Sequence, residues 1–480
     1  MSKPMKIEAT LKGNEVEIHN VLCSISLPLV HGGKVPVTCC FDAQDTRPLH
    51  LGFEFSLAAV VADSSGNKQS EFRANRVYWL NHATEYYSNK RAEAVLQAEA
   101  VDFTLTRFYS NETVLEKGES SSFWLTPSLL LRPSGSVEMR FDTGVKFNTH
   151  HVRSCNLPGM LGTRFESHLV YHDDKPDRLF SASEHLVAVV NRPQEPSIDR
   201  QLENLERFLT LISFAERHRC ICYRYSTRKL GQASDHFRGD IAIPEIRKER
   251  SLNDTLIDAT HFDEFVAIAY PLFLNSPYGR YLADAMMKLA YSDDRTLESE
   301  YIAYFAGLEN LLNAYREQKS QPGILATSDW KAFEGDLRNF IKHHQLLKDD
   351  SNKRALLYEK MGELNRLSLN AMLQEFGRDA RINFAGLWPV ADKVPEGVNL
   401  YQIRNQIVHG RLLPRSGYDP LIVAKEHLRW VLERCVLALV GWDFAKSRAC
   451  DPQLRQSTFT GWERESRVLR TAWQNAQALL

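Results

Sequence analysis

The first part of the chain alternates apolar and polar residues with a period of two. Residues 16–19, 51–57 and 100–106 show this alternation, which is typical of half-buried β-strands. Turn-forming runs such as residues 64–67 separate these segments. Several short strands at this spacing predict a β-rich region over residues 1 to about 190, arranged as a sandwich or an open barrel.

A helical period appears after this region. One apolar stripe at spacings of three and four predicts a helix over residues 198–217. The stripe consists of Leu202, Leu205, Leu209 and Ile212. A strand over residues 220–225 and a polar linker over residues 247–251 are expected to follow.

Beyond residue 252 the pattern predicts helices alone. The expected helices cover residues 261–274, 277–292, 295–317, 328–347, 351–376, 397–410, 420–445 and 461–479. Pro277 and Pro420 stand at helix starts, where a missing N–H costs nothing. Gly377 and Gly410 follow expected helix ends, as C-terminal caps do.

Together these patterns predict an α+β protein in two parts. A β-rich domain over residues 1–250 precedes an all-α domain over residues 251–480. The 480 residues are 43% hydrophobic and 25% charged, which is an ordinary globular composition. The formal net charge of −1 excludes a globally basic nucleic-acid-binding surface. Any phosphate-binding surface must therefore be a local patch.

The chain carries no sign of secretion or membrane insertion. The first 20 residues contain no apolar core of a signal peptide, and no run of 18 apolar residues occurs. The eight cysteines form no C-x-x-C pair, which argues against a zinc ribbon. Scattered thiols in a long chain predict a soluble protein of the reducing cytoplasm, with no membrane partner.

The segment at residues 400–411 carries the most specific candidate chemistry. Its apolar positions form a helical stripe, and Arg404, Asn405 and His409 lie off that stripe. Arginine offers a planar fork of donors that grips phosphate. Histidine titrates near neutral pH and can transfer protons. These are the two requirements for cleaving RNA through its own 2′-OH without a metal.

The Arg-x4-His spacing alone is weak evidence, because the sequence contains it twice. The second copy runs from Arg338 to His343 and even repeats the following Asn. Its surroundings are basic, which is typical of a solvated or phosphate-contacting stretch. The first copy is followed by Gly410 and a long apolar helix, and an apolar helix over residues 301–312 precedes it. This context favours the first copy.

In this context the sequence over residues 404–410 resembles the R-N-x-x-x-H-G motif of the HEPN superfamily, specifically of its ApeA-like antiphage branch. The resemblance covers roughly residues 260–445, and the β-rich half also looks like the N-terminal part of ApeA-like proteins. It implies an endoribonuclease that acts as a homodimer without a metal or cofactor. In that role His409 would be the general base or acid, Arg404 would hold the scissile phosphate, and Asn405 would orient it.

Glu309 is a further candidate for the site. It shares the apolar face of its predicted helix, and a buried carboxylate needs a partner, for which Arg404 is suited. A salt bridge that only fixes helix packing is the alternative. Five helical steps place Arg404 and His409 about 140° apart. Either the helix ends near Gly410 and turns His409 back, or two copies of the motif meet across a two-fold axis.

The partners implied are RNA, with tRNA as one candidate, a second copy of the chain, and a phage protein as trigger for a sensor in the first half. A non-catalytic HEPN dimer serving as a binding or antitoxin-like module is the alternative function. Two sets of residues have weaker metal-ligand potential. They are His218 with Cys220 and Cys222 on one strand face, and His150 and His151 with Cys155.

Overall fold

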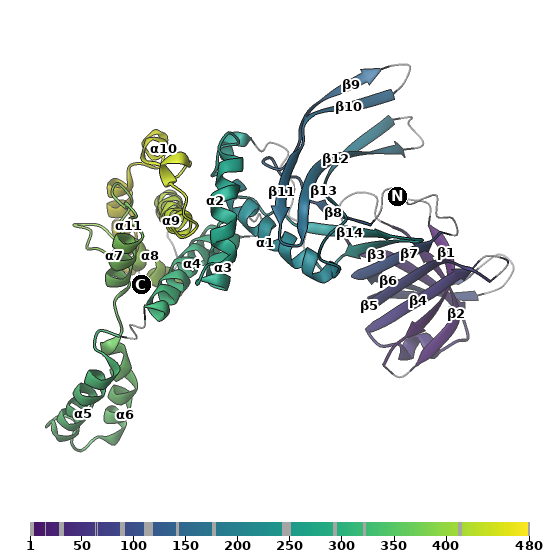
Figure 1. The fold of residues 1–480 in the computed structure, drawn as a ribbon. Helices are drawn as coiled ribbons and strands as arrows, with labels where there is room; N and C mark the ends of the chain where they lie inside the picture. Colours follow the sequence, from purple (N-terminus) through teal and green to yellow (C-terminus); the bar gives the residue numbers. More distant parts are fainter. Residues whose placement is uncertain are drawn as a thin grey trace. The chain divides into compact units, whose positions relative to one another are not determined.

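The chain folds into two compact units in the computed structural model (Figure 1). The structure describes residues 4–14, 16–27, 33–62, 64, 66–86, 92–109, 119–140, 144–174, 179–241, 251–290, 295–319, 323–410 and 415–478. The first unit comprises residues 1–209 and 220–250, and the second comprises residues 210–219 and 251–480. The expected linker at residues 247–251 lies outside the described residues except for Ser251.

The first unit is built on antiparallel strands. They are β1 (Met5–Lys12), β2 (Glu17–Ile25), β3 (Val35–Asp42), β4 (Glu54–Ala62), β5 (Lys68–Tyr86), β6 (Ala92–Ala100), β7 (Asp102–Phe108), β8 (Ser120–Leu125), β9 (Ser134–Arg140), β10 (Gly144–His151), β11 (Arg153–Leu157), β12 (Met160–Asp174), β13 (Leu179–Asn191), β14 (Cys222–Lys229) and β15 (Gln232–Arg238). The predicted β-rich character of this half is confirmed. The strand expected at residues 220–225 begins only at Cys222.

Strands β1 to β6 form a closed ring in the order β5-β4-β1-β2-β3-β6, because β6 pairs again with β5. The sequence predicted a sandwich or an open barrel, and the β5–β6 pairing is what closes the ring. Beyond β5 the sheet continues as β7-β15-β14-β8-β13-β12-β11, while β9 and β10 pair with each other. Residues 70–74 of β5 pair with β7, and residues 77–86 pair with β6. This one strand therefore belongs to both the ring and its extension.

The second unit is helical. Its helices are α2 (Phe262–Leu274), α3 (Gly279–Leu289), α4 (Leu297–Gln318), α5 (Thr327–His343), α6 (Ser351–Lys360), α7 (Leu369–Asp379), α8 (Leu400–Val408), α9 (Tyr418–Leu439), α10 (Asp451–Gln456) and α11 (Trp462–Ala478). Helix α4 packs against α3, α7, α8 and α9, and α9 also packs against α11. None of the helices in the described part of the chain is long and apolar enough to cross a bilayer.

Two helix predictions were wrong in their extent. The single helix expected over residues 351–376 is divided into α6, a 3₁₀ segment (Met361–Asn365) and α7. The division arises because the side chain of Ser368 accepts a hydrogen bond from the Ala371 N–H and starts a new helix. Helix α9 ends at Leu439 rather than near residue 445, and the short helix α10 was not predicted.

The two glycines expected to cap helices have different roles. Gly410 has φ +71° directly after α8, which is the left-handed conformation of a C-terminal cap, so this prediction is confirmed. Gly377 lies inside α7, and its prediction as a cap was wrong. A Cβ atom at Gly377 would lie 2.8 Å from the ring of Phe384. Close packing of that ring on the helix explains the absence of a side chain there.

Residues 210–219 bring the last part of α1 (Ile198–Glu216) into the helical unit. The carbonyl of Ala215 accepts hydrogen bonds from the N–H groups of Leu256 and Ile257. Arg217, which follows the helix with φ +51°, forms two hydrogen bonds of 2.7 Å with the carboxylate of Glu433. Glu433 is 0% exposed, so this ion pair is a buried element of the helical unit.

A buried histidine gives the helical unit a pH-dependent stability. His427 of α9 accepts a hydrogen bond at Nδ1 from the Trp388 N–H and donates from Nε2 to the carbonyl of Phe459. Burial lowers the pKa of His427 from 6.5 to about 4. The unfolded chain therefore binds one more proton than the folded protein between these pH values.

Stability is consequently expected to fall as the pH decreases from 6.5 to 4, and His427 should contribute a loss of about 3 kcal/mol. Urea unfolding of the wild type and of His427→Gln, measured at pH 7 and at pH 4, isolates this contribution. The stability advantage of the wild type should shrink by about this amount at the lower pH. An advantage that does not change with pH would show that protonation of His427 is not linked to unfolding.

Candidate functional site

The start of α8 is fixed by reciprocal hydrogen bonds. The side chain of Asn399 accepts from the Gln402 N–H at 2.8 Å, and the side chain of Gln402 accepts from the Asn399 N–H at 2.9 Å. This arrangement is a capping box. The amide of Asn399 also donates to the carbonyls of Ala391 and Asp392. The helix that carries the R-N-x-x-x-H-G sequence therefore begins at a defined position and direction.

Helix α8 is held against α4 by its apolar residues. Leu400 and Ile403 are fully buried, as the predicted stripe requires. The buried hydroxyl of Tyr301 on α4 donates to the carbonyl of Leu400 at 2.7 Å. These contacts leave Arg404 and Asn405 partly exposed on the side of α8.

Arg404 and Glu309 meet between α8 and α4, as expected from the sequence. Their closest atoms, Arg404 Nη2 and Glu309 Oε2, are 3.5 Å apart. The Glu309 side chain is 29% exposed, so the expectation that it is buried on the apolar face was wrong. The buried face of α4 instead passes through Phe305, Leu308 and Leu312. An ion pair at this exposure is weak in itself and leaves both groups accessible to a ligand.

Asn405 contacts Arg404 directly. Its Oδ1 accepts a hydrogen bond of 3.2 Å from Nη1 of Arg404. The guanidinium is thus held by Glu309 on one side and by Asn405 on the other. Within one chain, Asn405 is placed to orient the arginine rather than a phosphate.

A cleft of about 590 Å³ opens beside this ion pair. It is lined by Glu309, Asn313, Glu363, Arg366, Leu367, Ser368, Leu369, Asn370, Met372, Ala391, Tyr401 and Arg404. Arg366 and Asn370 could not be selected from the sequence, because the segment that carries them was predicted as one continuous helix and is divided in the structure. Tyr401 could have been found, since it lies three residues before Arg404 on the same helical face.

His409 does not line this cleft. It caps α8 with φ −80° and ψ 12°, close to helical values, and it is exposed. The helix does end at Gly410, but the backbone does not turn His409 back toward Arg404. Of the predicted site residues, the structure brings together Arg404, Asn405 and Glu309 and leaves His409 apart from the cleft.

The second Arg-x4-His copy is engaged in local contacts on α5. Arg338 forms an ion pair with Glu334 one turn earlier, at 2.6 Å, and lies over the ring of Tyr358. Nδ1–H of His343 donates to the carbonyl of Asn339 at 2.9 Å. Both side chains are thus engaged in local contacts. The two helices α5 and α6 that carry these contacts lie side by side (Figure 1).

The metal-ligand candidates whose side chains the structure describes do not form a cluster. Within the described residues, no three side chains of His, Cys, Asp or Glu are grouped so that they could hold a metal ion. His218 and Cys220 precede β14, so they do not share a strand face with Cys222. Cys220 instead donates its thiol to the carbonyl of Thr126. The side chains of His150 and His151 lie outside those that the structure describes.

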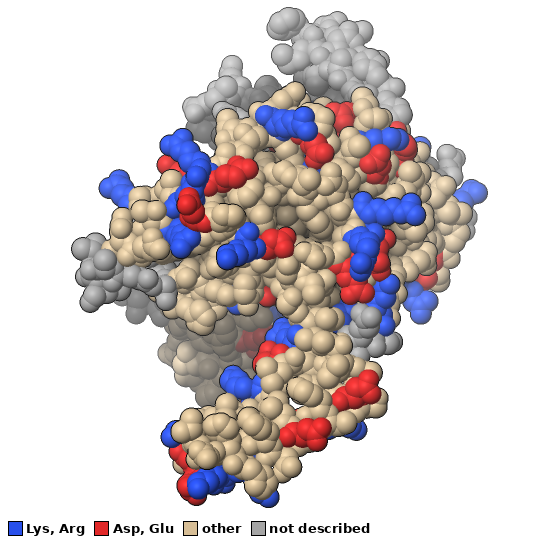
Figure 2. All heavy atoms as spheres, turned by 90° about the vertical axis from the view of Figure 1, so that its left-hand side faces the viewer, with Lys and Arg blue, Asp and Glu red and all other residues tan. Residues whose placement is uncertain are grey.

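Charge is mixed rather than segregated on the face of the molecule drawn in Figure 2. Lys and Arg side chains lie there among Asp and Glu side chains and do not merge into one basic field. This agrees with the formal net charge of −1.

Comparison with protein-family models and with curated proteins found no match to this chain. The function is therefore inferred from the geometry of the site.

Proposed function

We propose that the helical unit is a metal-independent endoribonuclease of the HEPN type. The observation that carries this proposal is the position of Arg404, which pairs with Glu309 at 3.5 Å on the wall of a cleft. Arg404 precedes His409 and Gly410 in the order and at the spacing of the R-N-x-x-x-H-G motif of HEPN proteins. An arginine with a fork of donors at a cleft wall suits a phosphodiester.

The proposed reaction uses the RNA as its own nucleophile. The 2′-OH attacks the adjacent phosphorus and the bond to the 5′ oxygen breaks, which leaves a 2′,3′-cyclic phosphate and a 5′-OH. His409 accepts the proton of the 2′-OH or donates one to the leaving 5′ oxygen. Arg404 binds the phosphate oxygens, whose charge develops during the attack. Glu309 and Asn405 keep the guanidinium in place.

A second copy of the chain completes the proposed site. His409 is exposed and lies outside the cleft that Arg404 lines. A two-fold pair of α8 helices would bring His409 of one protomer near Arg404 of the other. The homodimer is therefore part of the proposed function.

The surroundings of the cleft suit a single-stranded RNA. Asn313 and Arg366 also line a second cleft of about 490 Å³, whose wall includes Arg316 and Trp330. Arginines that contact a backbone and aromatic rings that stack on bases are the usual elements of such a surface. A single-stranded loop, for instance in tRNA, would fit this combination.

The biological role proposed is antiphage defence by abortive infection in the cytoplasm. A nuclease that attacks cellular RNA must be held inactive until it is needed, and a regulatory element must carry that control. The β-rich unit contains no catalytic set that the sequence or the structure identifies within its described residues. We assign it the role of sensor, with a phage protein as the trigger.

The chemistry can be tested with a purified protein and a defined RNA. Cleavage should persist in EDTA and should stop when a 2′-deoxy nucleotide replaces the residue before the cut. The products should carry a 2′,3′-cyclic phosphate and a 5′-OH, which mass spectrometry distinguishes. A matched RNA with the 2′-deoxy substitution elsewhere is the control. Loss of activity in EDTA with rescue by Mg²⁺ would point to a different nuclease mechanism.

The exposed position of His409 favours one second candidate. If dimerisation does not bring His409 of one protomer near Arg404 of the other, the unit would act as a non-catalytic HEPN dimer, a binding or antitoxin-like module. The two candidates differ in a single measurement. The first cleaves RNA and loses this activity in His409→Ala, whereas the second binds its partner without cleavage.

A further inference from the structure

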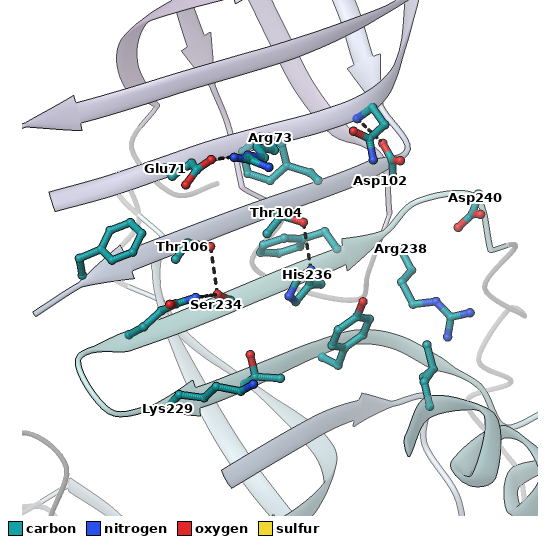
Figure 3. A pocket seen from close by; sticks show the side chains of 18 residues that line it. Glu71, Arg73, Asp102, Thr104, Thr106, Lys229, Ser234, His236, Arg238 and Asp240 are labelled. Carbon is teal, nitrogen blue, oxygen red and sulfur yellow. Dashed lines mark hydrogen bonds and ion pairs between the residues drawn. The ribbon is translucent and has the colours of Figure 1, made fainter. Parts of the chain in front are cut away.

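A pocket of about 860 Å³ lies on one face of β5, β7, β15 and β14 in the β-rich unit (Figure 3). The pairing register places polar side chains in rows across these strands. One row is Glu71, Thr106, Ser234 and Thr227, and the next is Arg73, Thr104, His236 and Tyr225. Their neighbours Phe72, Phe103 and Phe237 are buried in the apolar core on the opposite face. The period of two therefore separates a polar pocket floor from the core.

The middle of the floor, on β7 and β15, consists of uncharged donors and acceptors. The hydroxyls of Thr106 and Ser234 are 2.9 Å apart, and Nδ1 of His236 lies 2.9 Å from the Thr104 hydroxyl. The rings of Tyr225 and His236 stack, with centroids 4.5 Å apart and an interplanar angle of 17°. Burial lowers the pKa of His236, which keeps the imidazole neutral at neutral pH. A ligand on this floor is recognised by hydrogen bonds and ring contacts rather than by charge.

The charges around the rim are mostly neutralised by the protein itself. Arg73 forms an ion pair with Glu71. Arg238 pairs with Glu206 of α1 at 2.7 Å. The rim carboxylate Asp240 is likewise paired at 3.0 Å with an arginine of β5.

Lys229 is the exception on this rim. Lys229 is exposed, and it forms no ion pair with a carboxylate among the residues that the structure describes. Figure 3 shows Lys229 at one end of the pocket, and the alternation along β14 places it on the same strand face as Tyr225 and Thr227. The four residue steps from Tyr225 to Lys229 span about 13 Å. Along β14 the site thus offers the ring of Tyr225, then the hydroxyl of Thr227, and then at Lys229 a cation that no described carboxylate pairs with.

We propose that this pocket binds a nucleoside monophosphate. The base would lie beside Tyr225 and His236, and the ribose hydroxyls would bond to Thr227 and Ser234. The phosphate would pair with Lys229. A ligand with a neutral polar ring, hydroxyl groups and one terminal anion matches the order of these groups along β14. The proposal is independent of whether the helical unit cleaves RNA.

Isothermal titration of the full chain with AMP, GMP, CMP and UMP, the four nucleosides, and inorganic phosphate tests this assignment. At least one nucleotide should bind with a Kd below about 1 mM, and its nucleoside should bind about tenfold more weakly. Lys229→Ala should lower the affinity for the nucleotide about tenfold and leave that for the nucleoside unchanged. Thr227→Val, which keeps the shape of the side chain, should weaken both.

Arg228→Ala is the matched control, because Arg228 is exposed on the same strand and points to the opposite face. It should bind the nucleotide as the wild type does. Three outcomes would overturn the assignment. They are no binding of any mononucleotide at millimolar concentration, binding that survives both Lys229→Ala and Thr227→Val, and binding of an oligoribonucleotide without binding of mononucleotides.

Discussion

His409→Ala is expected to lose detectable RNA cleavage while remaining folded. Removal of a proton-transfer group costs about 10²–10⁴-fold in rate, and His409 is exposed, so its side chain contributes little to packing. Arg404→Ala should have a comparable effect, because the proposed site would lose its phosphate-binding cation. Turnover at saturating RNA is the measurement, with circular dichroism to establish that each variant is folded.

His343→Ala is the matched control, since it removes the histidine of the second Arg-x4-His copy. The imidazole of His343 donates a hydrogen bond to the carbonyl of Asn339 within the same helix. The variant should keep most of the cleavage rate at saturating RNA, with at most a modest change in RNA binding and its salt dependence. If His343→Ala is inactive and His409→Ala is active, the site must be rebuilt around Arg338.

Arg217→Met is expected to destabilise the helical unit by about 3 kcal/mol or more. The substitution removes both hydrogen bonds to the carboxylate of Glu433, which is 0% exposed. Arg429, at 3.5 Å, then remains as its ion-pair partner among the described residues. Hydrogen exchange of α9 amides in urea measures the free energy of unfolding of this unit.

Two further variants separate burial from charge pairing. Lys446→Met removes an exposed ion pair with Glu264 within the helical unit, and it should change stability by less than about 1 kcal/mol. Combining Arg217→Met with Glu433→Leu removes both buried charges and should restore most of the loss. An Arg217→Met protein as stable as the Lys446→Met protein would mean that the buried carboxylate does not require Arg217.

The elements with a strong hydrophobic period were predictable from the sequence. The apolar stripe of α8 and the left-handed Gly410 both follow from local chemistry, so the position of Arg404 could be anticipated. The pairing of Glu309 with Arg404 was also anticipated, although the burial of Glu309 was overestimated. A helical period identifies a face but does not fix how far each side chain on its border is covered.

Long-range features were not predictable in this way. The pairing of β5 with β6 closes the ring, and Arg366 lines the same cleft as Arg404. The local sequence around these residues contains no signal of either arrangement. The same holds for Arg217 and Glu433, which are 216 residues apart in the chain. Such contacts depend on the register and packing of whole elements rather than on local propensity.

The last residues of α1 limit how this chain could be recombined. The polypeptide changes from β-rich to helical sequence near residue 250. Ala215 and Arg217 precede this point, yet both form hydrogen bonds with residues of the helical unit. A genetic exchange at residue 250 that replaced everything upstream would leave Glu433 buried without this arginine. The helical unit on its own would therefore need residues 210–219 in addition to residues 251–480. Because β14 and β15 lie between these two segments and pair with β8 and β7, no single crossover would exchange the whole β-rich unit and leave the helical unit complete.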